Sequence, residues 1–477
     1  MKVTFIIKNI GFLEYFSIPL LSAIIKQGGV SVQLINFSEK FSNNLERIKQ
    51  FSPDIIGYSV ASAESKDYLE INNRLKRHFS FFSVFGGPHA TFFPQLIEEQ
   101  GVDAVCIGEA DLAFPKFLDA YKSREYFGVE NFIFKNQKNF PVLLDLVENL
   151  DTLPFPDRKL IYDQSYFLRE NPIKQFFAGR GCPFGCSYCF NKKYNQLYHG
   201  KGKIVRNKSV AYLIDEINAV RNYYPLNFIK FHDDCFGLNK DWLETFAEKY
   251  PREIGLPFLN YARPNVITDD YCRALKNAGC HSVCLALECG DENIRNDILH
   301  RQLSDKMLYA ACDFLHKHKI KIYSLNMVGL PGENEKEMLH TVSMNQKIGV
   351  DFADASIFQP YYGTEIMEYC VKKKLISVNK IFFTSQYNDS MLDIDRQMKK
   401  KIFILHRLFS VIVDYPVMLL MYKLLTHKLI RFPLFFLTVF SRLYYSLFLH
   451  KRIYLNKIPF LLRIYASIHV VFSKNRN

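Results

Sequence analysis

Glycine and proline are scarce in this sequence, with 22 and 19 of them among 477 residues. This composition excludes collagen-like, low-complexity and disordered chains. The opening residues MKVTFIIKNIGF lack the pattern of a secretory signal, and no apolar run has the roughly 20 uncharged residues that a membrane-spanning helix needs. Because 48% of the residues are hydrophobic, we expect a globular protein of two or three domains.

The 11 cysteines are an odd number in a chain without a predicted signal segment. A disulfide framework is therefore not indicated, and we expect a protein of the reducing cytoplasm. In that compartment the cysteines are buried thiols or metal ligands.

Residues 1–125 alternate short apolar runs with amphipathic segments, which is typical of a parallel sheet covered by helices on both faces. We predict a doubly wound, flavodoxin-like or Rossmann-like α/β domain. Its five expected strands begin near Val3, Val30, Asp54, Phe81 and Asp103.

Ligands of such a sheet bind at the carboxyl ends of its strands. Four loops of this domain are therefore candidate ligand loops. One is KNIGFLE after the first strand, and the others run from Ser59 to Ser62, from Gly86 to Thr91 (GGPHAT) with Gly87 and His89, and from Gly108 to Asp111 with Glu109. No GxGxxG motif follows the first strand, so a dinucleotide site is only weakly indicated. The alternative for the glycine pair is packing in an ordinary turn.

Residues 126–170 are interrupted by prolines and are expected to connect two domains. Six further strand and helix repeats then occupy residues 171–375. Repeats of this size predict a partial TIM barrel of the (β/α)6 type, with its catalytic groups at the carboxyl ends of the strands.

The strongest motif is GRGCPFGCSYCFN, in which Cys182, Cys186 and Cys189 follow the first strand of the predicted barrel. Three thiolates in one loop can bind three irons of a [4Fe-4S] cluster and leave the fourth iron open to a chelating ligand. Structural zinc is the alternative, but zinc sites use four ligands in paired spacings, and no second CxxC or HxxxH pair occurs.

At these residues the chain resembles the radical S-adenosylmethionine (SAM) superfamily, whose CxxxCxxC motif commonly has an aromatic residue where Tyr188 stands. The resemblance continues through FHDDCF, ARPN, LALECG and MVGLPGE. It implies that SAM binds the open iron and is cleaved to a 5'-deoxyadenosyl radical.

The SAM-binding residues that this resemblance implies are Tyr188, Asp233, Asp234, Arg263, Glu288, Gly329 and Gly332. Arg263 is expected to pair with the methionyl carboxylate, and the Gly329 to Gly332 turn to approach adenine. Alternatively, one aspartate caps a helix, Arg263 pairs with Glu288, and Gly332 only shapes a turn. We expect His232 to be a hydrogen-bonded histidine at a strand end.

A flavodoxin-like domain before such a barrel resembles the cobalamin-binding class of radical SAM enzymes. This resemblance makes Ser59, Ser62, Gly86, Gly87, His89, Gly108 and Glu109 candidate cobalamin-binding residues. The chain departs from the better-known cobalamin motif because it has no DxHxxG, so no histidine of that motif can ligate cobalt.

The resemblance implies methylation of an unactivated carbon in a small-molecule substrate, with a flavodoxin, ferredoxin or reductase as electron donor. Radical cyclisation or oxidation with the same cofactors is the alternative. An iron–sulfur electron-transfer protein is a third hypothesis, which explains the cysteines but not the remaining motifs.

Residues 376–477 form a predicted basic, aromatic-rich helical region. Of the net charge of +13, the stretch from Lys401 onward supplies most, because it has twelve Lys or Arg and one acid, Asp414. Basic residues among Leu and Phe are typical of helices in a membrane interface, which would suit a lipid or hydrophobic substrate. Helices that cap the barrel show the same periodicity, whereas nucleic-acid binding is disfavoured. Pro416, Pro433 and Pro459 are expected to divide the region.

Overall fold

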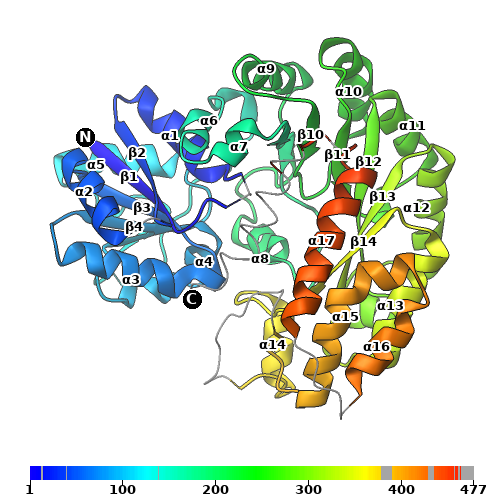
Figure 1. Cartoon of the computed structure of the whole chain (residues 1–477). Helices are drawn as coiled ribbons and strands as arrows, with labels where there is room; N and C mark the ends of the chain where they lie inside the picture. The colour runs from blue at the N-terminus through cyan, green and yellow to red at the C-terminus, as the bar shows by residue number, and fades with distance from the viewer. Residues whose placement is uncertain are drawn as a thin grey trace. The chain divides into compact units, whose positions relative to one another are not determined.

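The computed structural model describes residues 1–11, 14–38, 40–137, 139–377, 389–427, 434–455, 457–459 and 462, and every structural statement concerns these residues. The chain forms two compact units, of which the first contains residues 1–170 and 193–206. The second contains residues 171–192 and everything from 207 onward. Each unit is coloured by position along the chain in Figure 1.

The first unit contains a six-stranded sheet in the order β2-β1-β3-β4-β5-β6. The five predicted strands are present and parallel: β1 (Lys2–Ile7), β2 (Ser31–Asn36), β3 (Ile55–Ser59), β4 (Phe82–Gly86) and β5 (Ala104–Cys106). The order 2-1-3-4-5 is that of flavodoxin-like folds, in which ligands bind where the order reverses, between β1 and β3. The predicted fold class is therefore confirmed for this unit.

Segment 126–170, expected as a connection, contributes a strand of its own. Within it, β6 (Phe132–Phe134) pairs antiparallel with β5 and has three buried side chains. The α-helices of its first segment, residues 1–170, are α1 (Ser17–Gln27), α2 (Phe41–Phe51), α3 (Ser65–Lys76), α4 (Gly87–Phe92), α5 (Ala113–Ser123), α6 (Arg158–Tyr162) and α7 (Tyr166–Glu170). Because α4 begins at Gly87, the GGPHAT loop of the sequence is the start of a short helix.

The second unit is built on a sheet of six parallel strands in the order β14-β13-β12-β11-β10-β7. The strands are β7 (Ile173–Phe176), β10 (Phe228–Phe231), β11 (Phe258–Ala262), β12 (Cys280–Glu288), β13 (Lys321–Val328) and β14 (Phe352–Ile357). Helices α9 (Val210–Arg221), α10 (Lys240–Glu253), α11 (Asp269–Asn277), α12 (Asp305–Lys317) and α13 (Glu335–Ile348) cover its outer side (Figure 1). This is the predicted (β/α)6 partial barrel.

Capping residues explain where the outer helices begin. Ser209, Asn239, Thr268 and Ser304 each accept a backbone N–H of the first turn, and Asn334 forms a full capping box with Glu337. Such caps satisfy donors that a helix leaves free at its amino end.

The remaining elements outside the carboxyl-terminal region are β8 (Gly179–Arg180), α8 (Phe190–Leu197), β9 (Arg206–Asn207) and α14 (Glu365–Lys372).

The carboxyl-terminal region is helical, as predicted, with α15 (Arg396–Asp414), α16 (Met418–Thr426) and α17 (Leu434–Arg452). Pro416 separates α15 from α16, whereas Pro433 lies outside the described residues. Ile402, Leu405 and Phe409 of α15 are buried in the barrel's hydrophobic core. For α15 the structure therefore favours the cap over the membrane interface. No helix within the described ranges combines the length and apolarity needed to cross a bilayer.

Candidate active site

The three cysteines of the CxxxCxxC loop lie together beyond the end of β7. Cys182 and Cys186 are buried, and Asn191 donates its backbone N–H to Cys189 Sγ at 3.5 Å. Burial raises the pKa of the Cys182 thiol, and it raises the pKa of Cys189 to about 12. Among the described residues, no three His, Cys, Asp or Glu side chains converge on one metal ion. Three thiols in one loop, without a fourth paired ligand, suit a cluster in which each binds a different iron, and this role of the cysteines stays a prediction.

Backbone hydrogen bonds fix this loop to the barrel. Ser187 Oγ donates to the Ile298 carbonyl at 2.5 Å, and the Ser187 N–H donates to the Leu299 carbonyl at 3.1 Å. The carbonyl of Ser187 accepts the N–H of Ile366 at 3.0 Å. A ligand loop held by such bonds keeps its geometry before the metal arrives.

Arg263 lies at the end of β11 and contacts the loop directly. Its Nη1 donates to Cys186 Sγ at 3.2 Å, its Nη2 donates to the Arg301 carbonyl at 2.6 Å, and its guanidinium carbon lies 4.0 Å from the centre of the Phe184 ring. A positive donor at a ligating sulfur stabilises the thiolate. Its role as partner of the methionyl carboxylate stays a prediction.

Glu288, Tyr188 and Arg301 form a buried network inside the barrel. Tyr188 donates its hydroxyl hydrogen to Glu288 Oε1 at 2.9 Å and accepts from Arg301 Nη1 at 2.6 Å. Arg301 Nη1 lies 3.4 Å from the same carboxylate oxygen. Burial raises the pKa of Glu288, and the Arg301 charge opposes that shift. Glu288 therefore pairs with Arg301, and the ion pair with Arg263 that was the alternative is not the arrangement here.

Sequence reasoning missed Arg301, and its conformation shows why. His300 and Gln302 on either side have φ angles of 52° and 50°, and Glu288 has a φ of 68°. Non-glycine residues in this left-handed region are uncommon and concentrate at functional sites. The sequence HRQLS carries no motif that marks Arg301 as a buried residue.

The two adjacent aspartates have different surroundings. Asp233 is buried, and its Oδ2 accepts the Ala178 N–H at 3.0 Å, so it joins β10 to the start of the cysteine loop. Burial raises the pKa of Asp233 to about 7. Asp234 is exposed, and its charge raises the pKa of Cys182 and Cys189. Asp234 is thus the aspartate near the cysteines, and Asp233 has the structural contact.

The glycines after β13 have positive φ angles, 77° for Gly329 and 80° for Gly332. A Cβ on Gly329 would lie 2.8 Å from a side-chain carbon of Ile402 on α15, whereas nothing lies within 4 Å of one on Gly332. Glu333 accepts the backbone N–H groups of Gly329 and Leu330 at 2.7 and 2.9 Å. Packing of α15 therefore explains the first glycine, and Gly332 leaves open space beside the turn.

In the first unit, two of the predicted cobalamin loops pack closely. Gly87 has a φ of 90°. A Cβ there would lie 2.7 Å from the backbone nitrogen of Val60, a residue of the loop that contains Ser59 and Ser62. His89 Nδ1 and Ser62 Oγ form a hydrogen bond of 3.1 Å, and burial lowers the pKa of His89 to about 4. His89 is therefore neutral near pH 7. Gly86 closes β4 beside these residues.

Gly108 and Glu109 are engaged by segment 193–206, which follows the cysteine loop in sequence. A Cβ on Gly108 would lie 2.0 Å from the Tyr198 hydroxyl, and that hydroxyl accepts the Glu109 N–H at 2.8 Å. The Glu109 carboxylate binds Arg206 at 2.6 and 3.0 Å and accepts from Tyr194 at 2.9 Å. These contacts account for the glycine at position 108 and for the Glu109 side chain without a ligand, so the cobalamin contacts of both residues stay predictions.

Three of the predicted loops nevertheless meet at the carboxyl edge of the sheet. Val60 donates its N–H to the Gly86 carbonyl at 2.8 Å, and Gly108 donates to Thr91 Oγ1 at 3.0 Å. This edge lies where flavodoxin-like sheets bind ligands, and it offers backbone groups and the Ser59 hydroxyl. The residues fit a polar cofactor held by loops.

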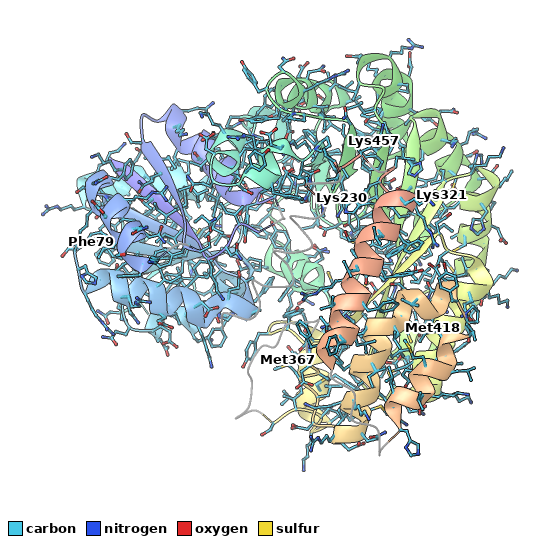
Figure 2. The ribbon with its side chains drawn as sticks, viewed as in Figure 1. Phe79, Lys230, Lys321, Met367, Met418 and Lys457 are labelled. Atoms are coloured by element: carbon cyan, nitrogen blue, oxygen red, sulfur yellow. The ribbon has the colours of Figure 1, made fainter. Side chains whose placement is uncertain are left out.

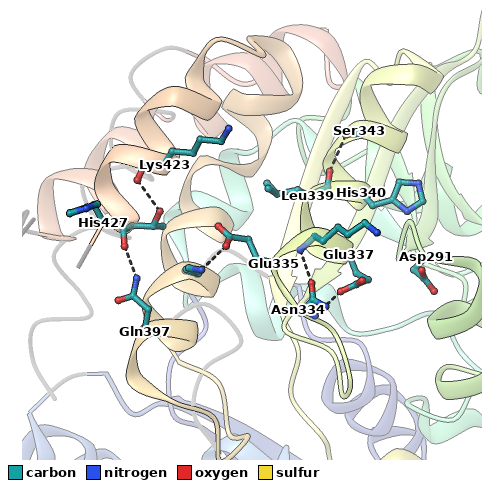
Figure 3. Close-up of a pocket in the computed structure, with 13 residues that line it drawn as sticks. Asp291, Asn334, Glu335, Glu337, Leu339, His340, Ser343, Gln397, Lys423 and His427 are labelled. Atoms are coloured by element: carbon teal, nitrogen blue, oxygen red, sulfur yellow. Dashed lines mark hydrogen bonds and ion pairs between the residues drawn. The ribbon is translucent and has the colours of Figure 1, made fainter. Parts of the chain in front are cut away.

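A separate cavity of about 1500 Å³ lies between α13, α15 and α16 in the second unit (Figure 3). Its lining is strongly charged, but Lys401 pairs with Glu335 at 2.5 Å and Asn334 caps α13. None of the predicted site residues lines it. We therefore assign the chemistry to the cysteine loop and the barrel interior.

Two family models match the sequence. The radical SAM superfamily model matches residues 177–344, and a B12 binding domain model matches residues 11–118. The first range includes the cysteine loop and the Glu288 network, and the second includes all three predicted cobalamin loops.

Curated relatives are similar to this sequence over most of its length. An uncharacterized methyltransferase of Pyrococcus horikoshii is 28% identical over 70% of this chain and 73% of its own length. Cytidylyl-2-hydroxyethylphosphonate methyltransferase of Streptomyces wedmorensis is 21% identical over 76% and 75%. Anaerobic magnesium-protoporphyrin IX monomethyl ester cyclase of Rubrivivax gelatinosus is 22% identical over 74% and 65%.

Among solved structures, the cobalamin-dependent SAM radical enzyme OxsB with aqua-cobalamin bound has a TM-score of 0.68 at 14% identity. The match covers 99% of this chain and 79% of OxsB, and it shows a shared fold. The two family models confirm the expected resemblance. They match the chain in the same order as the two units of the structure, with the B12 binding domain first and the radical SAM domain second. The chain belongs to the cobalamin-binding class of radical SAM enzymes, whose cofactors are a [4Fe-4S] cluster, SAM and cobalamin.

Proposed function

We propose that this enzyme methylates an unactivated carbon of a hydrophobic or natural-product-like small molecule. The observation that carries the proposal is a three-thiol loop at the carboxyl end of a (β/α)6 barrel, in one chain with a 2-1-3-4-5 sheet. When bound, the cluster with SAM supplies a 5'-deoxyadenosyl radical, and cobalamin supplies the methyl group.

The chain's own residues hold and orient these groups. Cys182, Cys186 and Cys189 bind the cluster, and Arg263 keeps the Cys186 sulfur in place. The Arg301 charge opposes the burial that raises the pKa of Glu288 and so favours its carboxylate form, which would face the SAM sulfonium and amine. Tyr188, Asp234, Gly329 and Gly332 are the other proposed SAM contacts.

Product mass tests the proposal. The full chain is purified without oxygen, reconstituted with iron, sulfide and cobalamin, and incubated with SAM, a chemical reductant and candidate hydrophobic substrates. Methylation adds a CH2 unit to the product. A product that has lost hydrogens would instead favour a cyclase or oxidase, a function carried by the relative from Rubrivivax gelatinosus. Absence of 5'-deoxyadenosine would contradict both enzymatic functions and leave the hypothesis of an electron-transfer protein.

A small-molecule substrate and an electron donor are expected for any radical SAM enzyme. We propose a flavodoxin, ferredoxin or reductase as the donor, and the cytoplasm as the compartment. Cobalamin would be held by the loops with Ser59, Ser62, Gly86, Gly87 and His89, and by the backbone at Gly108 and Glu109.

We further propose that α17 contacts an anionic membrane surface peripherally and that the substrate is lipid-like. Phe436, Phe440, Leu443 and Leu447 form a stripe at helical spacing, and they are between 43% and 61% exposed. A helix on a globular protein normally has a polar outer face. The excess of basic residues from Lys401 onward complements anionic lipid. The same charge would make two copies of this region repel each other, which disfavours a dimer through α17.

Vesicle sedimentation of the full chain tests this contact. Replacing Phe440, Leu443 and Leu447 by Gln should weaken binding to phosphatidylglycerol vesicles about tenfold or more, because binding scales with buried apolar area. The matched control replaces Tyr166, Tyr223 and Met307 by Gln. These side chains are exposed but lie outside α17, so this variant should bind vesicles as the wild type does. Equal binding by both variants, or self-association abolished by the first, would contradict the proposal.

A further inference from the structure

Lys230 and His232 lie at the carboxyl end of β10 on the inner side of the barrel. Ile229 and Phe231, which alternate with them, are buried in the core formed with the outer helices. Because side chains alternate along a strand, Lys230 and His232 point to the opposite side. There both lie against Tyr261: the Lys230 ammonium is 5.5 Å from its ring centre, and the two ring centres of His232 and Tyr261 are 5.0 Å apart.

Lys230 and His232 are both partly buried, and no hydrogen bond or ion pair joins either side chain to a polar group of the described residues. Within the described part of the chain, Lys230 forms no hydrogen bond or ion pair, and buried Nε2 of His232 has no hydrogen-bond partner. The expectation that His232 is a satisfied strand-end histidine is therefore wrong for this nitrogen, since its neighbour is an aromatic ring.

Among the described residues, neither interior acid, Glu288 or Asp354, forms an ion pair with Lys230. Glu288 is held by Tyr188 and Arg301, and Asp354 accepts from the Tyr323 hydroxyl at 3.3 Å. Burial lowers the pKa of Lys230, and the nearby Cys284 thiol partly opposes that shift. Burial lowers the pKa of His232 to about 3, and the neighbouring Lys230 charge adds to the shift.

A cation that is largely removed from water and has no counter-ion among the described residues destabilises the folded protein, so Lys230 needs a reason other than packing. Such uncompensated groups in the interior of an enzyme are typical of binding sites. The Lys230 ammonium would balance the charge of an anion placed between it and the imidazole, and His232 would donate a hydrogen bond to that anion. The Tyr261 ring would shield the anion from water.

We propose that Lys230 and His232 bind an anionic group of the substrate, a carboxylate or a phosphate, inside the barrel. This inference rests on the proposed function only in taking the barrel interior as the substrate site. It places the acidic end of the substrate at β10, with Asp233 and Asp234 following directly in sequence. A hydrophobic substrate of this enzyme is then an amphiphile with an acidic group.

Binding of benzoate and inorganic phosphate to the reconstituted full-length holoenzyme tests the proposal, with benzyl alcohol as the neutral probe. We expect one of the two anions, but not the alcohol, to bind and to raise the thermal unfolding midpoint. Lys230→Met should weaken that binding about tenfold or more, as expected for loss of a buried charge-assisted contact. The same variant should unfold at an equal or higher temperature than the wild type, because it removes an uncompensated buried charge.

Lys321→Met is the matched control (Figure 2). Lys321 begins β13, is half exposed and pairs with Asp351 at 2.6 Å, so its loss should leave anion binding unchanged. Equal binding by wild type and Lys230→Met, or equal binding of the alcohol, would overturn the proposal. So would a lowered unfolding midpoint for Lys230→Met, which would make the lysine structural. Displacement of the anion by SAM would assign the site to the methionyl carboxylate instead.

These outcomes are independent of turnover. Formation of 5'-deoxyadenosine without substrate should persist in Lys230→Met, since the cysteine loop is intact in that variant. Loss of the radical reaction in the wild type would contradict the proposed function, whereas loss of anion binding alone would contradict only this inference.

Discussion

Replacing Cys186 by Ala should abolish the brown absorbance of the reconstituted protein and all reductive cleavage of SAM. The variant lacks one of three thiolates, and two ligands cannot retain a cluster whose fourth iron is already without a protein ligand. It also leaves Arg263 Nη1 without the sulfur that it contacts at 3.2 Å. Iron and sulfide content, visible absorbance and 5'-deoxyadenosine formation measure the effect.

Cys312→Ala is the control for this prediction. Cys312 is also a buried free thiol, but it lies on α12 in the hydrophobic core. Its removal should lower stability modestly and leave the iron content and the cleavage rate close to wild type. Retained turnover in Cys186→Ala would contradict the assignment of the loop.

Replacing Arg301 by Met should lower the free energy of unfolding by about 3–5 kcal/mol, because it leaves a buried carboxylate without its counter-charge. Arg301 is 2% exposed, and it binds the Tyr188 hydroxyl, Glu288 and the Ala286 carbonyl. Glu288 should then take up a proton, since burial already raises its pKa. We therefore also expect weaker SAM binding, measured by equilibrium titration of the reconstituted protein.

Arg295→Met separates the loss of folding stability from the loss of SAM affinity. Arg295 is fully buried, donates to the carbonyls of Cys289 and Leu303 at 2.8 and 2.9 Å, and pairs with Asp305. Its loss should destabilise the protein by a similar amount, but it has no contact with Glu288 or Tyr188. SAM affinity that falls equally in both variants would mean that Arg301 acts only through general stability.

Local pattern was enough to predict much of the candidate site. The CxxxCxxC spacing, Tyr188 and the strand-end carboxylate Glu288 are sequence-local features, and the structure brings all of them to one end of the barrel. Arg301 was not predictable, because it comes from a polar loop and reaches the interior through two flanking left-handed residues. The roles of Gly108 and Glu109 also depended on residues of a distant segment, Tyr198 and Arg206.

The sequence by itself determined the two α/β folds, the candidate cysteine ligands and the family, because hydrophobic periodicity and motif spacing are properties of neighbouring residues. Only the tertiary structure decided which polar groups are satisfied. Glu288 has an ionic partner and Lys230 has none among the described residues, because partners come from other strands and loops, whose distances the order of residues does not state. For the same reason α15 could be assigned to the barrel's core only from its packing, since a capping helix and an interfacial helix share one periodicity.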